Sequence, residues 1–333
     1  MKKKICLAMA GLLCLSVGVG CSSQPDDTTL TPVRLNEVVH SVFYAPQYAA
    51  LELGFFEEEG LDVTIAVGNG ADKSMTALLS DSADIALLGI EAGLYVHNEG
   101  KENHPMVFAQ LTQRAGNFLV SRVDEPDFQW TDLKGKSVIG GRLGGMPELV
   151  LEYVIKENGM SIGKDVEIVT NIDFNSTAGA FTGNVGDYTV EFEPVATTLE
   201  QSGAGHIVAS LGEASGYVPY TVYMASDDFL NENPEAVEAF TRAIYRGQQW
   251  VASHTSAEIA ETVLPHFPES DAETLTTIIE RYKTQDTWKT DPTIDAGGFE
   301  LIQDIMGQGG ELDSRVAYED LVLTNYSETV MNK

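Results

Sequence analysis

Cysteine is scarce in this chain, and its few cysteines stand together near the N-terminus. Of the 333 residues three are cysteine: Cys6, Cys14 and Cys21. If the segment before Cys21 is removed on export, the mature chain keeps a single thiol. We therefore exclude disulfides, thiolate metal sites and a cysteine nucleophile.

Positively charged residues are also few. Lysine and arginine number 20 against 50 aspartates and glutamates, which gives a net charge of −30 at pH 7. Removing Lys2, Lys3 and Lys4 with the N-terminal segment leaves 17 basic residues against 50 acidic ones, a net charge of −33. Such a chain would be repelled by nucleic acid, so we expect no nucleic-acid partner. The acidic residues are spread along the chain, which is typical of a solvated surface and indicates no ligand.

No apolar run is long enough for a comfortable membrane span. The apolar stretch from Ile5 to Val19 is shorter than the roughly 20 residues that cross a bilayer. It follows three lysines and precedes Gly20 and Cys21, which is the order of a bacterial export signal. We predict that residues 1–20 are a signal peptide that is cleaved.

Cys21 resembles the lipidated cysteine of a lipobox, because it follows a small residue and precedes serines. One position departs from that pattern, since Gly18 stands where a larger aliphatic residue is usual. We expect lipidation of Cys21, which would anchor the protein to the membrane, and the alternative is plain secretion from a nearby site. Residues 21–34 are polar and are predicted to form a flexible tether.

From Leu35 onward, strand-like and helix-like segments alternate. Val63, Ile65 and Val67 alternate as in a strand, and "DIALLG" is a short apolar run that follows a helical pattern. The order strand, helix, strand, helix implies an α/β fold with parallel strands and right-handed crossovers.

The same order recurs from Lys136, through "KSVIGG", "DVEIV" and "DYTVEF". Pro46 and Pro147 both stand where a helix would begin, a position that proline favours. After Leu211 the chain is mainly helical, and this tail of about 100 residues is expected to return to the first lobe. We predict two lobes, with lobe 1 formed by residues 35–112 and 220–333 and lobe 2 by residues 113–219.

Several segments, in their order along the chain, resemble one family of transport proteins. They are "FYAPQYAALELGFFEEEGLDV", "GADKSMTALLSDSADIALLG", "DLKGKSVIGGRLGG", "FEP" and "NPEAVEAF". They resemble the substrate-binding proteins of ABC importers for nitrate, alkanesulfonates and thiamine pyrimidine precursors. The resemblance implies a two-lobe periplasmic-binding-protein-like type II fold that closes over a small molecule. It also implies an extracytoplasmic monomer without a cofactor, which delivers its ligand to the permease subunits.

Ligands of such sheets lie beyond the carboxyl ends of the strands, so the loops there supply the candidate residues. In the first loop, Phe43 and Tyr44 offer flat apolar faces to a ring. Ser41 and Gln47 are their polar neighbours. The alternative for both rings is packing beneath their own loop.

The second loops are rich in glycine. Asn69 and Gly70 stand in "GNGADK" of the first lobe, and "GGRLGGMP" of the second lobe precedes a helix. Backbone donors and the positive end of that helix make an anion or carbonyl site plausible. The candidates in this second loop are Arg142, Gly144, Gly145 and Met146. Arg142 would add a bidentate contact to an anion, or would be a solvated charge.

The third loops carry Glu91 and Glu193 at matching places in the two lobes. If both faced the cleft, they would suit an amine or an aminopyrimidine edge and would repel an anion. The alternative for each is local capping of a helix N-terminus. Tyr217 stands beside the segment that returns the chain from lobe 2 to lobe 1. It would line the floor of the cleft or pack in the core.

Three functional classes remain to be weighed. A binding protein fits the export signal, the tether and the paired lobes. A pyrimidine-synthase-like or chorismate-processing-like enzyme shares the fold but works in the cytoplasm, and a transcriptional regulator would need a DNA-binding helix pair. The histidines have no metal-ligand spacing and no serine stands in a nucleophile elbow. We predict a binding protein with neither metal nor catalytic residues, and a nitrogen heterocycle as ligand ahead of an alkanesulfonate or nitrate.

Overall fold

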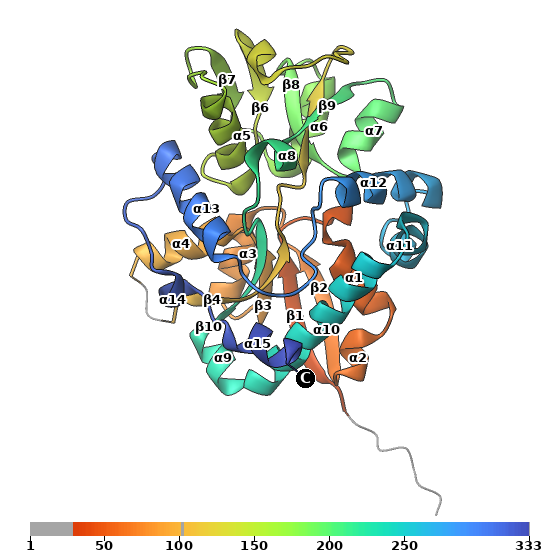
Figure 1. Ribbon diagram of the computed structural model, residues 1–333, viewed down its shortest axis with the longest axis vertical. Helices are drawn as coiled ribbons and strands as arrows, with labels where there is room; N and C mark the ends of the chain where they lie inside the picture. Colours follow the sequence, from red (N-terminus) through yellow and green to blue (C-terminus); the bar gives the residue numbers. More distant parts are fainter. Residues whose placement is uncertain (1–28, 101–102, 333) are drawn as a thin grey trace, which may run out of the picture.

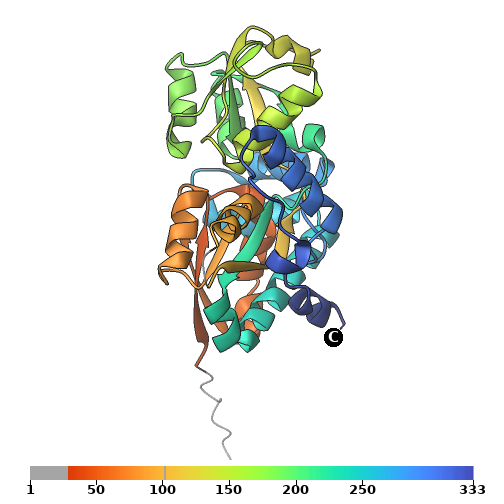
Figure 2. The ribbon, with the colours of Figure 1, turned by 90° about the vertical axis from the view of Figure 1, so that its left-hand side faces the viewer.

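The protein consists of two lobes, each built on a five-stranded sheet (Figure 1). The computed structural model describes residues 29–100 and 103–332. The predicted signal peptide and Cys21 lie outside these residues. The turned view in Figure 2 shows the two lobes stacked along the long axis of the molecule.

The sheet of lobe 1 combines parallel strands with one antiparallel insertion. β1 runs parallel to β2 and β3, and β10, from much later in the chain, lies antiparallel between β3 and β4. All residues of β4 and β10 are buried, because helices cover both faces of the sheet. The strand order is β2 (Leu61–Val67), β1 (Thr31–Glu37), β3 (Ile85–Leu88), β10 (Thr221–Ser226) and β4 (Pro105–Thr112).

The expected tether, residues 21–34, is too long at its C-terminal end. Thr31 to Arg34 already pair with Leu61 to Thr64 as part of β1. Arg34 is exposed at the end of this paired segment, and its guanidinium forms an ion pair with Asp84.

Lobe 2 repeats the plan of lobe 1. β6 runs parallel to β7 and β8, while β5 runs antiparallel to β8 and β9. The prediction of two α/β lobes is confirmed, although the sequence patterns missed β4, β5, β9 and β10. The strand order is β7 (Val166–Val169), β6 (Lys136–Ile139), β8 (Tyr188–Phe192), β5 (Asn117–Ser121) and β9 (His206–Ser210).

Helices cover the faces of both sheets, and α1 and α5 begin beside Pro46 and Pro147 as predicted. Lobe 1 carries the short 3-10 helix η1 (Val42–Tyr44) and α1 (Ala45–Glu52), α2 (Phe55–Glu58), α3 (Ala71–Leu79) and α4 (Ile90–Asn98). Lobe 2 carries α5 (Met146–Glu157), α6 (Thr177–Thr182), α7 (Val195–Gln201) and α8 (Leu211–Ser215). The C-terminal tail forms α9 (Asp227–Glu232), α10 (Pro234–Ser253), α11 (Ser256–Val263), α12 (Ala272–Thr284), α13 (Ala296–Gly309), α14 (Tyr318–Leu321) and α15 (Asn325–Met331).

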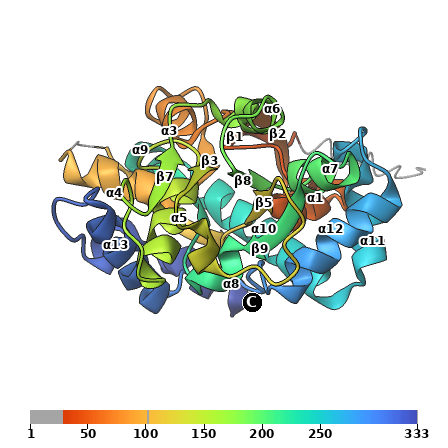
Figure 3. The same ribbon diagram turned by 90° about the horizontal axis from the view of Figure 1, so that it is seen from above.

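The tail covers lobe 1 and also reaches lobe 2, which the sequence did not lead us to expect. α10 packs against α1, and α15 packs against α10 and β4. In contrast, Arg281 of α12 binds Glu193 of lobe 2, and α13 packs against α5. Figure 3 shows α12 and α13 on opposite sides of the molecule. The tail therefore touches both lobes on two sides of their junction.

Two short segments connect the lobes and lie side by side. The first joins β4 to β5, and the second joins α8 to β10. Thr112 and Thr221 share a hydrogen bond of 2.6 Å between their hydroxyl oxygens, and the backbone N–H of Tyr220 donates to the carbonyl of Thr112. The two connections between the lobes therefore lie next to each other.

Candidate ligand site between the lobes

A cavity of about 60 Å³ lies between the lobes. It forms where the loops after the strands and the N-termini of α3, α4 and α5 converge, as expected for α/β sheets. Its lining residues come from both lobes, and direct contacts across the boundary hold the lobes together around it. Six of the residues proposed from the sequence line it: Tyr44, Gly70, Glu91, Arg142, Gly145 and Met146.

Four aromatic side chains give the cavity a largely apolar wall. Tyr44 comes from η1 of lobe 1, and Phe192 from the last position of β8 in lobe 2. Phe174 follows β7, and Tyr220 belongs to the return crossing. The sequence analysis proposed only Tyr44 of these four, although the rule that ligands lie beyond strand ends would also have pointed to Phe174 and Phe192.

Glu91 is the one carboxylate that lines this cavity, within the described part of the chain, and it is 2% exposed. Its Oε1 accepts a hydrogen bond of 3.3 Å from the backbone N–H of Met146 across the lobe boundary. Its Oε2 is buried and has no hydrogen-bond partner. Gly89 leaves room for this oxygen, because a Cβ there would lie 1.9 Å from it.

Burial raises the pKa of Glu91 to about 7, against the lowering effect of three backbone N–H groups. The hydroxyl of Tyr220 lines the same cavity and is likewise buried without a partner. Because unpaired buried polar groups are costly, these two atoms mark the place where a ligand would complete the hydrogen bonding.

Arg142 lines the cavity from lobe 2, but its guanidinium is already engaged. Its Nη1 lies 2.6 Å from Oδ1 of Asp72 in lobe 1. A second bond crosses the boundary nearby, where the hydroxyl of Tyr95 donates to the carbonyl of Gly144 at 2.8 Å. Gly144 itself lines a neighbouring hollow, together with Asp72 and Tyr95.

Glu193 is not among the residues that line the cavity, so the structure does not bring it opposite Glu91. Its carboxylate accepts hydrogen bonds of 2.9 Å from the backbone N–H and from the hydroxyl of Thr197, and it forms an ion pair with Arg281. The neighbouring Glu191 is bound by Thr177 and Thr189. Glu193 corresponds to the local-capping alternative, because the backbone N–H of Thr197 in the first turn of α7 donates to it, and α12 adds Arg281 from far along the chain.

Phe43 and Gln47 are fully buried within the core. The ring of Phe43 contacts those of Tyr220, Phe192 and Tyr282 at centroid distances of 5.5–5.7 Å, which corresponds to the packing alternative for this residue. The side chain of Gln47 donates to Glu37 and accepts from Tyr223.

The remaining proposed residues also lie off the cavity. Ser41 caps η1, and its hydroxyl donates to the carbonyl of Glu193 at 2.5 Å. Asn69 is exposed in its loop with φ of 56°. Tyr217 is 47% exposed; it stacks under Arg114 and donates to Asp286.

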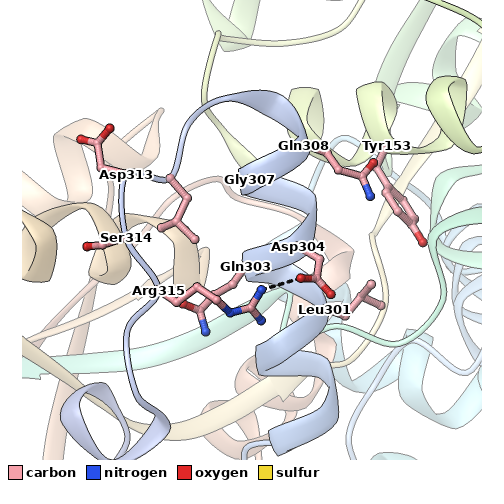
Figure 4. A pocket seen from close by; sticks show the side chains of 10 residues that line it. Tyr153, Leu301, Gln303, Asp304, Gly307, Gln308, Asp313, Ser314 and Arg315 are labelled. Atoms are coloured by element: carbon pink, nitrogen blue, oxygen red, sulfur yellow. Dashed lines mark hydrogen bonds and ion pairs between the residues drawn. The ribbon is translucent and has the colours of Figure 1, made fainter.

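A second, open hollow of about 490 Å³ lies on the outside of α13 (Figure 4). Tyr153 of α5, Asp304 of α13 and Arg315 are among its lining residues. Arg315 is paired with Asp304 and Glu300. None of the described residues around this hollow has a buried side-chain atom that lacks a partner. The cavity between the lobes is therefore the better candidate for a ligand site.

Two lobes that enclose a cavity at the facing ends of their sheets define the class of two-lobed solute-binding proteins. Comparison with known proteins then identifies the family. The family described as NMT1/THI5 like matches residues 42–257, and the chain belongs to this family.

Two relatives and one solved structure illustrate the similarity. YtlA of Bacillus subtilis, named as a candidate binding protein, is 44% identical over 326 residues, which cover 98% of this chain and 97% of YtlA. The formylaminopyrimidine-binding protein of Halalkalibacterium halodurans is 25% identical over 297 residues, which cover 84% of this chain and 86% of that protein. The structure of the alkanesulfonate-binding protein SsuA from Xanthomonas axonopodis pv. citri, bound to MOPS, matches with a TM-score of 0.70 at 14% identity, covering 88% of this chain and 98% of SsuA. The predicted periplasmic-binding-protein type II fold is confirmed.

Proposed function

We propose that this protein is the extracytoplasmic substrate-binding component of an ABC importer and that it captures a small nitrogen heterocycle. One observation carries the choice of ligand: the aromatic cavity contains a buried carboxylate oxygen of Glu91 without a partner. The similarity to YtlA supports a binding role, and the similarity to a formylaminopyrimidine-binding protein supports a nitrogen heterocycle as ligand.

The chemistry of the lining suits a flat ring that bears amino groups. The rings of Tyr44, Phe174 and Phe192 offer faces and edges for stacking. An amino N–H of the ligand would donate to Oε2 of Glu91, and a ring nitrogen would accept from the hydroxyl of Tyr220. Both buried atoms would then be satisfied by one bound ring.

An anion such as an alkanesulfonate or nitrate is the second candidate. Arg142 is the one cationic side chain among the described residues that line the cavity, and Asp72 already occupies its Nη1. Once Glu91 is ionised, its charge would repel an anion. The heterocycle is therefore favoured.

An enzyme on the same fold is less well supported. Within the described residues, the lining of the cavity contains no histidine, cysteine or lysine, so Glu91 is the main candidate for proton transfer. The extensive similarity to a candidate binding protein points in the same direction. Export, a lipid anchor at Cys21, a monomeric state and delivery to permease subunits rest on the sequence. No helix among the described residues is long and apolar enough to cross a membrane.

The test is a calorimetric titration of the purified protein with aminopyrimidines, short alkanesulfonates and nitrate. We expect aminopyrimidine binding, weakened about tenfold or more by Glu91→Gln, because the amide presents a donor where the ligand needs an acceptor. Glu191→Gln is the matched control, since Glu191 is also a buried carboxyl with its pKa raised by burial to about 7 but lies off the cavity. Binding of anions alone, or equal affinities of the wild type and Glu91→Gln, would contradict the proposal.

A further inference from the structure

We propose that Asp72 determines ligand charge selectivity, by holding Arg142 in an ion pair across the lobe boundary and so withholding it from anions. The inference rests on the proposed function in taking the cavity between the lobes as the ligand site. It assigns a role to a residue that does not itself line that cavity.

The pair joins the two lobes at the rim of the site. Asp72 stands in the first turn of α3 in lobe 1, and Arg142 stands in the loop between β6 and α5 in lobe 2. Arg142 lines both the ligand cavity and the neighbouring hollow, whereas Asp72 lines only the hollow. The carboxylate therefore approaches the guanidinium from the side away from the ligand.

Gly70 leaves the space that the pair occupies. Its φ is +143°, and a Cβ there would lie 2.7 Å from Oδ1 of Asp72 and 3.4 Å from Nη1 of Arg142. The sequence analysis proposed Gly70 as a residue of the ligand site. The structure shows that the same glycine admits the ion pair beside the cavity.

The ion pair of Asp72 and Arg142 affects the charge of the site more than the stability of the fold. The side chains of Arg142 and Asp72 are 44% and 55% exposed, and exposed pairs contribute little to folding. Burial tends to raise the pKa of Asp72, but the hydrogen bond and charge of Arg142 outweigh this effect and lower it. Asp72 thus remains ionised and balances the charge of Arg142 at neutral pH.

Removing the carboxylate of Asp72 should free Arg142 for an anionic ligand. In Asp72→Asn we expect the affinity for a short alkanesulfonate, measured by calorimetry, to rise about tenfold or more. The affinity for an aminopyrimidine should change by less than about threefold. Adding Arg142→Gln to Asp72→Asn should abolish the gain, because the gain depends on the freed guanidinium.

Asp81→Asn is the matched control. It removes the same charge from the same lobe, just beyond the C-terminal end of α3, at a residue that lines neither hollow nor cavity. An unchanged alkanesulfonate affinity in Asp72→Asn, or an equal gain in Asp81→Asn, would overturn the inference. This test is distinct from the test of the proposed function. A gain in alkanesulfonate affinity that depends on Arg142, in a protein that binds no aminopyrimidine, would support the selectivity role of Asp72 and refute the proposed ligand.

Discussion

The carboxylate of Glu193 ties lobe 2 to the C-terminal tail. Its side chain is buried, and its partners are Thr197 in the same lobe and Arg281 of α12. Arg281 also donates to the hydroxyl of Thr197 at 3.0 Å. Every carboxylate oxygen of Glu193 is thus engaged by the protein, which leaves none for a ligand.

We predict that Glu193→Gln lowers stability and leaves ligand selectivity unchanged. Removing one partner of a buried ion pair costs about 3–5 kcal/mol, and we expect roughly 2–3 kcal/mol here because Arg281 is partly exposed. Chemical denaturation measures the loss. Glu200→Gln is the control, because Glu200 faces the same guanidinium at 3.6 Å but is 41% exposed. Equal losses in both variants, or a tenfold loss of aminopyrimidine affinity in Glu193→Gln, would show that this account of Glu193 is wrong.

Sequence reasoning reached the loops of the site but could not orient the side chains within them. Phe43 and Tyr44 are adjacent, yet Phe43 packs against the crossing segments while Tyr44 lines the cavity. A Cβ at Gly116 would lie 2.2 Å from the ring of Phe43, so the direction of this ring is set by residues far along the chain. Contacts between residues that lie so far apart in the sequence produce no local sequence pattern. The same limit explains why Arg281 and Asp72 were not anticipated as the partners of Glu193 and Arg142.

At the scale of elements, α10 packs closely on α1 because Gly247 has no side chain. A Cβ at Gly247 would lie 2.3 Å from the carbonyl oxygen of Pro46 and 3.0 Å from Cβ of Ala50. The backbone of α1 cannot move aside easily, because its residues from Ala45 to Ala50 are all buried. The glycine therefore sets how closely the tail approaches the first lobe.

We predict that Gly247→Ala destabilises the fold by about 1–2 kcal/mol. Overpacking costs about 1–3 kcal/mol, and the better helix propensity of alanine returns part of it. Gly307→Ala in α13 is the control with the opposite sign, because nothing lies within 4 Å of its added Cβ. We expect that variant to be about 0.5–1 kcal/mol more stable than the wild type in chemical denaturation. Stabilisation by both substitutions would refute close packing at Gly247.

The alternation of strands and helices could be predicted, because each strand–helix–strand unit is contiguous in the sequence. The antiparallel strands were not, because their partners are distant: β10 pairs with β3 and β4, more than 100 residues earlier. β4 was not predicted, since its fully buried run shows no alternation of apolar and polar residues. The contacts of α12 and α13 with lobe 2 were not predicted for the same reason, because the contacting residues lie far apart in the sequence.

For the whole molecule, buried carboxyl groups make stability depend on pH, and three of them have a pKa close to neutral. Burial is the largest cause in each case and raises the pKa of Glu91, Glu148 and Glu191 to about 7 from the ordinary 4.5. The folded state therefore binds protons that the unfolded state releases. The stability that these groups contribute is complete below about pH 4.5 and is lost as the pH rises towards 7. Asp187 acts oppositely, because the backbone N–H of Ser137 lowers its pKa and its contribution is lost at acidic pH.

We predict that the unfolding temperature falls by roughly 5 °C or more between pH 5 and pH 8. Thermal unfolding followed by circular dichroism measures it. The overall negative charge acts in the same direction, but added salt screens exposed charges far more than buried groups. At high salt, Glu191→Gln should therefore have a flatter pH profile than the wild type. A wild-type profile that is flat at high salt would contradict the role of the buried carboxyls.

The closed arrangement of the lobes requires them to separate before a ligand can enter. Two contacts join the lobes beside the cavity: the hydroxyl of Tyr95 donates to the carbonyl of Gly144 in lobe 2, and Arg142 of lobe 2 pairs with Asp72 of lobe 1. The two adjacent crossing segments provide a hinge, and a ligand that contacts both lobes favours closure. Small-angle scattering should show a more compact molecule at saturating ligand.

Because one net hydrogen bond contributes about 0.5–1.5 kcal/mol, Tyr95→Phe should weaken ligand binding by roughly 2–10-fold and expand the scattering profile without ligand. Tyr318→Phe, which removes a hydroxyl bonded within the tail at Ile294, should leave both measurements unchanged. Identical scattering profiles with and without saturating ligand, in the wild type and in Tyr95→Phe, would show that the lobes do not move.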